Sequence, residues 1–175
     1  MKGRGLTNSS PALGNAEPIP VETEDPIDIV LSTTISAAGI YAAGDALGGL
    51  LTFANAARVA GGGGTITKIV ILDEDQELAP IDVVFFNVTF GATADNFPFD
   101  PSDADLANCI GYVDVAATDY ANFVDNSQAT KASGNRMPFD YDLVGTSLFA
   151  QMVVRGTPTY TAVDDITIKI TVRRA

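Results

Sequence analysis

Apolar and polar side chains alternate from Ile27 onward, which is the pattern of a β-strand with one buried face. Segment 166–173 repeats this period of two most cleanly, with one face formed by Ile166, Ile168, Ile170 and Val172. The pattern predicts a β-domain that begins at Ile27 and ends close to the C-terminus.

Further segments are rich in β-branched and aromatic residues and are predicted to be strands, namely 50–53, 65–72, 81–90, 110–115, 137–141 and 148–155. The acidic run 73–77 separates 65–72 from 81–90, so we expect these two strands to pair with each other. Before them, the glycines of 61–64 predict a flexible loop.

Helix signals are few. Segment 36–51 is rich in alanine, but each of its four glycines would cost about 1 kcal/mol inside a helix, so turn and strand are expected there. Asp100 in the N-cap place, Pro101 behind it and Asp103 after the cap predict one short helix that runs through Asn108.

These elements predict an all-β fold, an antiparallel β-sandwich of jelly-roll-like topology over residues 27–175. The predicted core includes Ile29, Leu31, Ile69, Ile71, Phe86, Val88, Ile168 and Ile170. Residues 1–26 contain four of the nine prolines and predict an extended N-terminal arm, because proline fixes φ and removes a hydrogen-bond donor.

Composition narrows the function. The 175 residues suit one domain, and a net charge of −12 disfavours nucleic acid and anionic membranes as partners. The chain has no histidine, which excludes catalytic triads that use His and zinc sites that contain His. Its one cysteine, Cys109, cannot form an intramolecular disulfide. We therefore expect no enzyme, no cofactor, no membrane span and no signal peptide, with synthesis in the cytosol.

Candidate sites have weak signatures. Between Ile69 and Thr130 there are twelve acids and no Lys or Arg, and Asp100, Asp103 and Asp105 cluster there without the spacing of an EF-hand. The run Gly61–Lys68 lacks the Gly-Lys-Ser/Thr of a phosphate loop. The acid pairs Asp140/Asp142 and Asp164/Asp165 are common in turns, and we predict no metal or catalytic site.

Two apolar clusters stand in predicted loops or strand ends, Phe97-Pro98-Phe99 and Met137-Pro138-Phe139. Such clusters more often fill a core than bind a partner. If exposed, they are candidates for a subunit interface, where aromatic residues and Met are enriched.

Several runs resemble small structural proteins of tailed bacteriophages: Tyr41–Gly49, Leu51–Phe53, Phe99–Leu106 and Arg155–Tyr160. The resemblance covers most of residues 27–175 and is to head decoration, or cement, proteins. It implies a β-rich homotrimer at local threefold positions on the outer surface of the capsid, with the major capsid protein as its partner. It supplies no catalytic or ligand-binding residues.

A cement role agrees with the arm, which can span roughly 80 Å if extended and would contact a capsid subunit or a neighbouring copy. The residues proposed for that contact are Lys2, Arg4, Leu13, Pro18, Ile19, Pro20 and Val21. The main alternative is a phage tail, fibre or baseplate module that binds host-surface glycan. A third, less favoured, is a ligand-binding sandwich from a bacterial operon.

Overall fold

The computed structural model describes residues 25–134 and 136–175. The first strand, β1 (Ile27–Ser32), begins where the alternation begins. The arm therefore lies outside the described residues except for Asp25 and Pro26, and the division into arm and domain stays a prediction.

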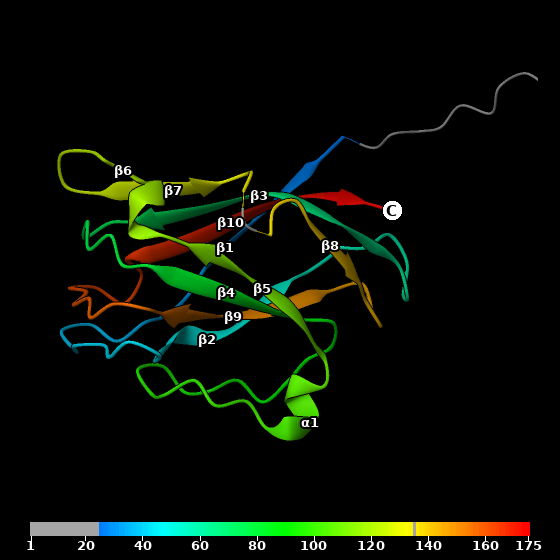
Figure 1. Cartoon of the computed structure of the whole chain (residues 1–175), viewed down its shortest axis with the longest axis horizontal. Coiled ribbons are helices and arrows are strands. Elements are labelled where there is room, and N and C mark those ends of the chain that lie inside the picture. The colour runs from blue at the N-terminus through cyan, green and yellow to red at the C-terminus, as the bar shows by residue number, and fades with distance from the viewer. Residues whose placement is uncertain (1–24, 135) are drawn as a thin grey trace, which may run out of the picture.

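Two antiparallel sheets pack face to face (Figure 1). Sheet I has the order β1, β10 (Ile166–Arg174), β3 (Gly63–Asp73), β7 (Ser127–Lys131) and β6 (Tyr120–Asn122), and β8 (Phe139–Asp142) pairs with the first residues of β3. Sheet II has the order β2 (Ala46–Phe53), β9 (Leu148–Val154), β4 (Ile81–Phe86) and β5 (Cys109–Val115).

This strand order is that of a jelly roll. When the short additions β6 and β8 are set aside, eight strands remain, and sheet I takes the first, eighth, third and sixth in turn. Sheet II takes the second, seventh, fourth and fifth. Two interlocked Greek keys produce this order, so the predicted all-β, jelly-roll-like sandwich is confirmed.

The expected pairing of 65–72 with 81–90 is wrong. β3 pairs with β10, β7 and β8, whereas β4 pairs with β5 and β9 in the other sheet. The connection 74–80 crosses from sheet I to sheet II, and it lacks the two-residue turn that joins hairpin strands. The inward faces of β3 and β4 therefore meet across the core.

The predicted core is mostly confirmed. Of its members, Ile69, Ile71, Ile168 and Ile170 are fully buried between the sheets, and Ile29 and Leu31 are half-buried against the same cluster because β1 is an edge strand. Phe86 is fully buried too, but in a second cluster on the outer side of sheet II. The prediction of Val88 as a core residue is wrong, because β4 ends at Phe86 and Val88 lies half-buried outside both clusters.

Glycine explains two boundary errors. Gly63 and Gly64 belong to β3 and not to a flexible loop. Glycine is needed there because a Cβ on Gly64 would lie 2.7 Å from the Tyr141 hydroxyl of β8. β2 begins at Ala46 and carries an irregularity after Leu47, where Gly48 has a φ of +74°. A Cβ at Gly48 would also collide with the Thr33 side chain.

The sequence did not predict β6 and β7, because Ser127–Lys131 is polar and lacks apolar alternation. The short helix exists as α1 (Asp103–Leu106), but its N-cap is Ser102 and not Asp100. A 3₁₀ turn (Ala117–Asp119) adds a second helical element. Within the described ranges, no helix is long and apolar enough to cross a membrane.

Candidate functional site

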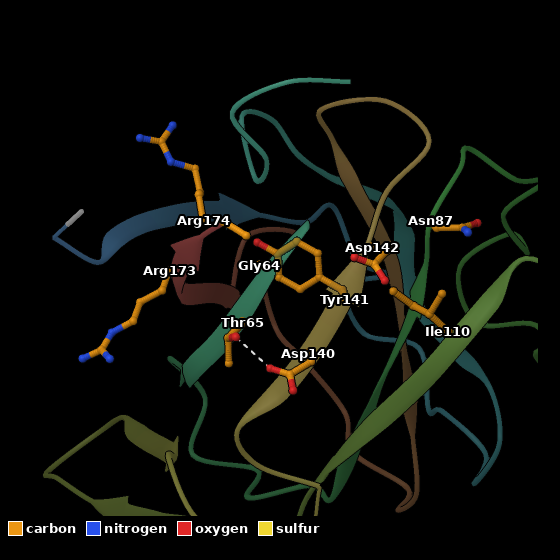
Figure 2. Close-up of a pocket in the computed structure, with 10 residues that line it drawn as sticks. Gly64, Thr65, Asn87, Ile110, Asp140, Tyr141, Asp142, Arg173 and Arg174 are labelled. Carbon is orange, nitrogen blue, oxygen red and sulfur yellow. Dashed lines mark hydrogen bonds between the residues drawn. The ribbon is translucent and has the colours of Figure 1, made fainter. Parts of the chain in front are cut away.

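A pocket of about 590 Å³ opens at the end of the sandwich where β1 begins and β10 ends (Figure 2). Its walls come from the start of β3, the last three residues of β8 and the end of β10, together with Asn87 and Ile110 from the sheet II side. We call it the arm-end pocket because the N-terminal arm joins β1 at this end of the sandwich.

Tyr141 anchors the floor of the arm-end pocket. Its side chain is almost fully buried, and its hydroxyl donates a 2.7 Å hydrogen bond to the carbonyl of Ala56. Burial raises the pKa of Tyr141 to about 12, so the hydroxyl stays protonated at neutral pH. Tyr141 therefore pins β8 to the loop after β2 and does not act as an acid or base.

The charged groups of the arm-end pocket are two carboxylates and two guanidinium groups. Asp140 accepts a 2.7 Å hydrogen bond from the Thr65 hydroxyl, and Asp142 lies two residues further along β8. In Figure 2 the side chains of Arg173 and Arg174 extend away from these carboxylates. This mixed, open surface suits contact with a polypeptide better than proton transfer to a substrate.

The opposite end of the sandwich, which we call the acidic end, is tied together by buried carboxylates. Asp73 is nearly inaccessible and accepts hydrogen bonds from the Leu78 N–H, the Asp75 N–H and the Ser127 hydroxyl. These bonds hold the β3–β4 connection against β7. Asp73 therefore sets the position of this connection relative to β7.

Asp75 and Asp165 share a hydrogen bond at the acidic end and both hold Thr161. Burial is the main reason that the pKa of Asp165 is raised, and the nearby Asp75 carboxyl adds to it. Burial would also raise the pKa of Asp75, but hydrogen bonds from Asp165 and Thr161 outweigh it and lower that pKa. The two carboxyls and Thr161 therefore join the β3–β4 and β9–β10 connections.

Two tyrosine hydroxyls, those of Tyr120 and Tyr160, are buried near Asp73 without a hydrogen-bond partner among the described residues. Burial raises both pKa values, and the charge of Asp73 adds to the effect. They remain neutral at physiological pH.

The long acidic stretch finds its cations elsewhere in the chain. Arg155 lies 2.8 Å from Asp82, and Lys131 lies 2.9 Å from Asp119 and 4.0 Å from Asp114. The absence of Lys and Arg between 69 and 130 therefore does not leave these carboxylates unpaired. Sequence order hides the pairing, because strands distant in the chain are neighbours in the sheets.

The candidate residues chosen from the sequence lie in different parts of the chain, and only some are among the described residues. All seven arm residues, Lys2, Arg4, Leu13, Pro18, Ile19, Pro20 and Val21, lie outside the described residues. Asp105 caps α1 together with Ser102, and the described residues hold no group of three acidic or Cys side chains suited to a metal ion. Phe97 is 61% exposed, whereas Met137 is buried in the core.

The sequence did not reveal the polar contacts between segments that are made by the buried side chains of Asp73, Asp165 and Gln151 and by half-buried Asp95. Each joins segments that are distant in sequence: Asp95, for example, accepts hydrogen bonds from Ser36, Tyr41 and Gly48. A polar residue inside an otherwise apolar strand, as Gln151 is in β9, was the one available signal.

Comparisons with known proteins add little. No protein family and no curated protein matches the sequence. A solved structure from Desmodium yellow mottle tymovirus aligns over 99% of this chain and 93% of that chain, with 13% identity and a TM-score of 0.26. An alignment this loose supports no inference about function.

Proposed function

We propose that the protein is a virion structural protein, a decoration or cement protein on the outer surface of a tailed-phage head. In this role it bridges neighbouring subunits of the major capsid protein and opposes the outward pressure of packaged DNA. The proposed active form is a homotrimer. No cofactor and no catalytic step belong to the role.

The observation that carries this proposal is the jelly-roll strand order of the two sheets. Jelly rolls recur in viral capsid proteins, in lectins and in cupins, so the fold narrows the choice to a few classes. The step from fold to function is made by analogy, and the phage context comes from the sequence resemblance.

Three features of the chain support the proposal. Buried carboxylates fix the loops of the acidic end, which gives a surface of constant shape. The net charge of −12 disfavours the DNA-facing side of a shell. An arm joined to β1 adds reach, and several modest contacts made together bind a lattice more tightly than one contact alone.

The arm would make the contact with a capsid subunit or a neighbouring copy. Lys2 and Arg4 can pair with shell carboxylates, although exposed pairs contribute at most about 1 kcal/mol each. Leu13, Ile19 and Val21 would enter apolar grooves, and the fixed φ angles of Pro18 and Pro20 would lower the entropy lost on docking.

The test is to compare phage particles that contain and lack the protein. Particles without it should assemble, yet release DNA at lower temperature or on osmotic shock, and addition of the purified protein should restore their resistance. A variant without residues 1–20 should keep its melting temperature, because the described strands are intact, but should occupy fewer capsid sites.

The same particles distinguish the alternative. If particles without the protein were as resistant as before but failed to adsorb to cells, a tail or baseplate module that binds host glycan would be the correct assignment. The Asp140 and Asp142 carboxylates of the arm-end pocket would then be the first candidates to bind sugar hydroxyls.

A further inference from the structure

β1 is an edge strand whose outer side is unpaired among the described residues (Figure 1). Exposure alternates along it, with Asp28, Val30 and Ser32 exposed and the intervening residues half-buried against the core. The strand contains no proline and no lysine. It therefore lacks two of the devices that commonly block an open sheet edge.

The backbone groups on that open edge can be identified. The Thr33 N–H donates to the Ile166 carbonyl, and this pair continues the register of β1 with β10. Hydrogen-bonded and non-bonded pairs alternate in an antiparallel ladder, so the odd-numbered residues of β1 bond to β10. The N–H and C=O groups of Asp28, Val30 and Ser32 consequently point to the open edge.

The arm contains a segment that matches this edge. In Glu17–Thr23 the two prolines stand at even positions, 18 and 20, and the odd positions Ile19, Val21 and Thr23 all keep an N–H. In an extended strand, alternate residues direct their backbone groups to the same side. Such a strand would donate along one side, and the prolines would remove donors from the other.

We propose that residues 17–23 of one copy add antiparallel to β1 of a second copy, with Val21 opposite Val30. Thr23 then lies opposite Asp28, and Ile19 lies opposite Ser32. Antiparallel addition is chosen because antiparallel pairs outnumber parallel ones two- to three-fold, roughly. The proline positions face solvent as the new edge, which ends the sheet.

The side chains fit the same arrangement. Residues directly opposite each other in a sheet project from the same face, so Val21 would lie beside Val30 on the outer face of sheet I. There Val30, Val70 and Leu72 border a shallow groove of about 250 Å³, together with Lys169 and two polar side chains. Val21 would extend this apolar strip across the new strand.

The occupant is a second copy because an arm cannot easily return to its own β1. Ile27 is already paired with Val172, which leaves only Glu24, Asp25 and Pro26 to reverse the chain. At the proposed register a hairpin within one chain would have residues 24–27 as its loop, but Ile27 is held extended in β1 and proline holds φ of Pro26 near −65°, so only Glu24 and Asp25 are free to turn the chain. Arms passed from copy to copy in one direction make a head-to-tail contact, which forms a ring when the rotation between copies closes.

Disulfide trapping tests the register. A chain with Val21→Cys is mixed with a tagged chain carrying Val30→Cys and oxidised, with the natural chain and its half-buried Cys109 as the baseline. Opposite residues of a bonded pair lie about 5.5 Å apart, within disulfide range. The matched control Glu22→Cys points to the other face and should form several times less cross-linked product.

A pair of proline variants tests the backbone pairing. Val21→Pro removes a donor that faces β1 and should raise the dissociation constant for self-association about five- to tenfold, whereas Glu22→Pro should leave it unchanged. Equal effects of the two proline variants, or no more product between Val21→Cys and Val30→Cys chains than the Glu22→Cys control gives, would overturn the proposal. Neither experiment involves a capsid, so each outcome is independent of the proposed function.

Discussion

The outer faces of the two sheets are finished in different ways. Residues 87–108 lie over the outer face of sheet II, where Val84, Phe86 and Val153 form a second apolar cluster with Phe90. The outer face of sheet I carries Thr, Lys and Gln side chains around Val30, Val70 and Leu72. The first face is covered by the chain itself, and the second is open among the described residues.

The closed face is held by polar ties as well as by apolar contact. The buried side-chain amide of Gln151 accepts from the Thr93 N–H and donates to the carbonyls of Gly48 and Thr93. Asp95 joins the same covering segment to Tyr41 and Gly48. The comparison teaches that buried polar groups accompany the face that the chain covers, whereas the uncovered face carries partly exposed valines.

The largest expected effect comes from removing the apolar support of the closed face. Phe86 is fully buried and stacks on Phe90 with ring centroids 3.8 Å apart, so Phe86→Ala should cost about 3–5 kcal/mol. Val30→Ala on the open face is the control and should change stability by less than about 0.5 kcal/mol. Urea unfolding measures both, and equal losses would contradict the distinction between the faces.

A glutamine on each face gives a second, smaller contrast. Gln151→Leu would leave the Thr93 N–H and two carbonyls without partners in a buried site and should cost about 3 kcal/mol. Gln128→Leu on the open face loses one local bond to Thr130 and should cost less than about 0.5 kcal/mol. If Gln151→Leu unfolded at the same urea concentration as the natural chain, the hydrogen bonds of the Gln151 amide would not contribute to stability.

Strands could be predicted from the alternation of apolar and polar residues where one face of the strand is buried and the other faces water. Segment 166–173 shows this clearly, and β10 lies within one residue of it. β7 could not be predicted in this way, because its inward positions hold Ser127 and Ala129 between strands that supply the apolar bulk.

The pairing of strands, and the hydrogen bonds of polar side chains between distant segments, depend on contacts that the order of the sequence does not reveal. The acidic run 73–77 suggested a hairpin, yet Asp73 is buried, half-buried Asp75 bonds to Thr161, and the chain crosses between the sheets. Asp75 meets Asp165 ninety positions away in the chain. Glycine was ambiguous for the same reason, since Gly64 is explained by Tyr141, a contact visible only in three dimensions.

Alkaline pH should loosen the closed face through Tyr41. Burial, with help from Asp95, raises the pKa of this hydroxyl, which donates to Asp95 at 2.8 Å and accepts from the Ser36 N–H. A raised folded pKa stabilises below the unfolded value of about 10 and loses that stabilisation as pH rises beyond it. Stability should therefore fall above about pH 10.

The variant Tyr41→Phe checks the assignment. It should cost about 1–2 kcal/mol at pH 8 through the lost hydroxyl bonds, and should make the alkaline decline shallower by about 1.4 kcal/mol per pH unit. Tyr120, Tyr141 and Tyr160 also have raised pKa values and sustain the rest of the decline. An unchanged slope in denaturation curves at pH 8–11 would exclude Tyr41 as a contributor.

On the open face the expected change in stability is the smallest, and it occurs as the pH falls and not as it rises. A hydrogen bond from the Thr171 hydroxyl, and the charge of Lys169 at 3.5 Å, lower the pKa of Asp28 although slight burial opposes them. A lowered folded pKa stabilises above the unfolded value of about 3.9 and loses that stabilisation as pH falls through the folded value.

Asp28→Asn should therefore lower the urea midpoint slightly at pH 7, and the difference should shrink as the pH falls and the carboxyl is protonated first in the unfolded chain and then in the folded one. Because Asp28 is exposed, added salt should shrink the difference at pH 7 further. A large loss that persists in high salt would mean that the β1 edge is held as firmly as the closed face. The open strand would then be a structural part of the domain, and not a surface kept free for a second copy.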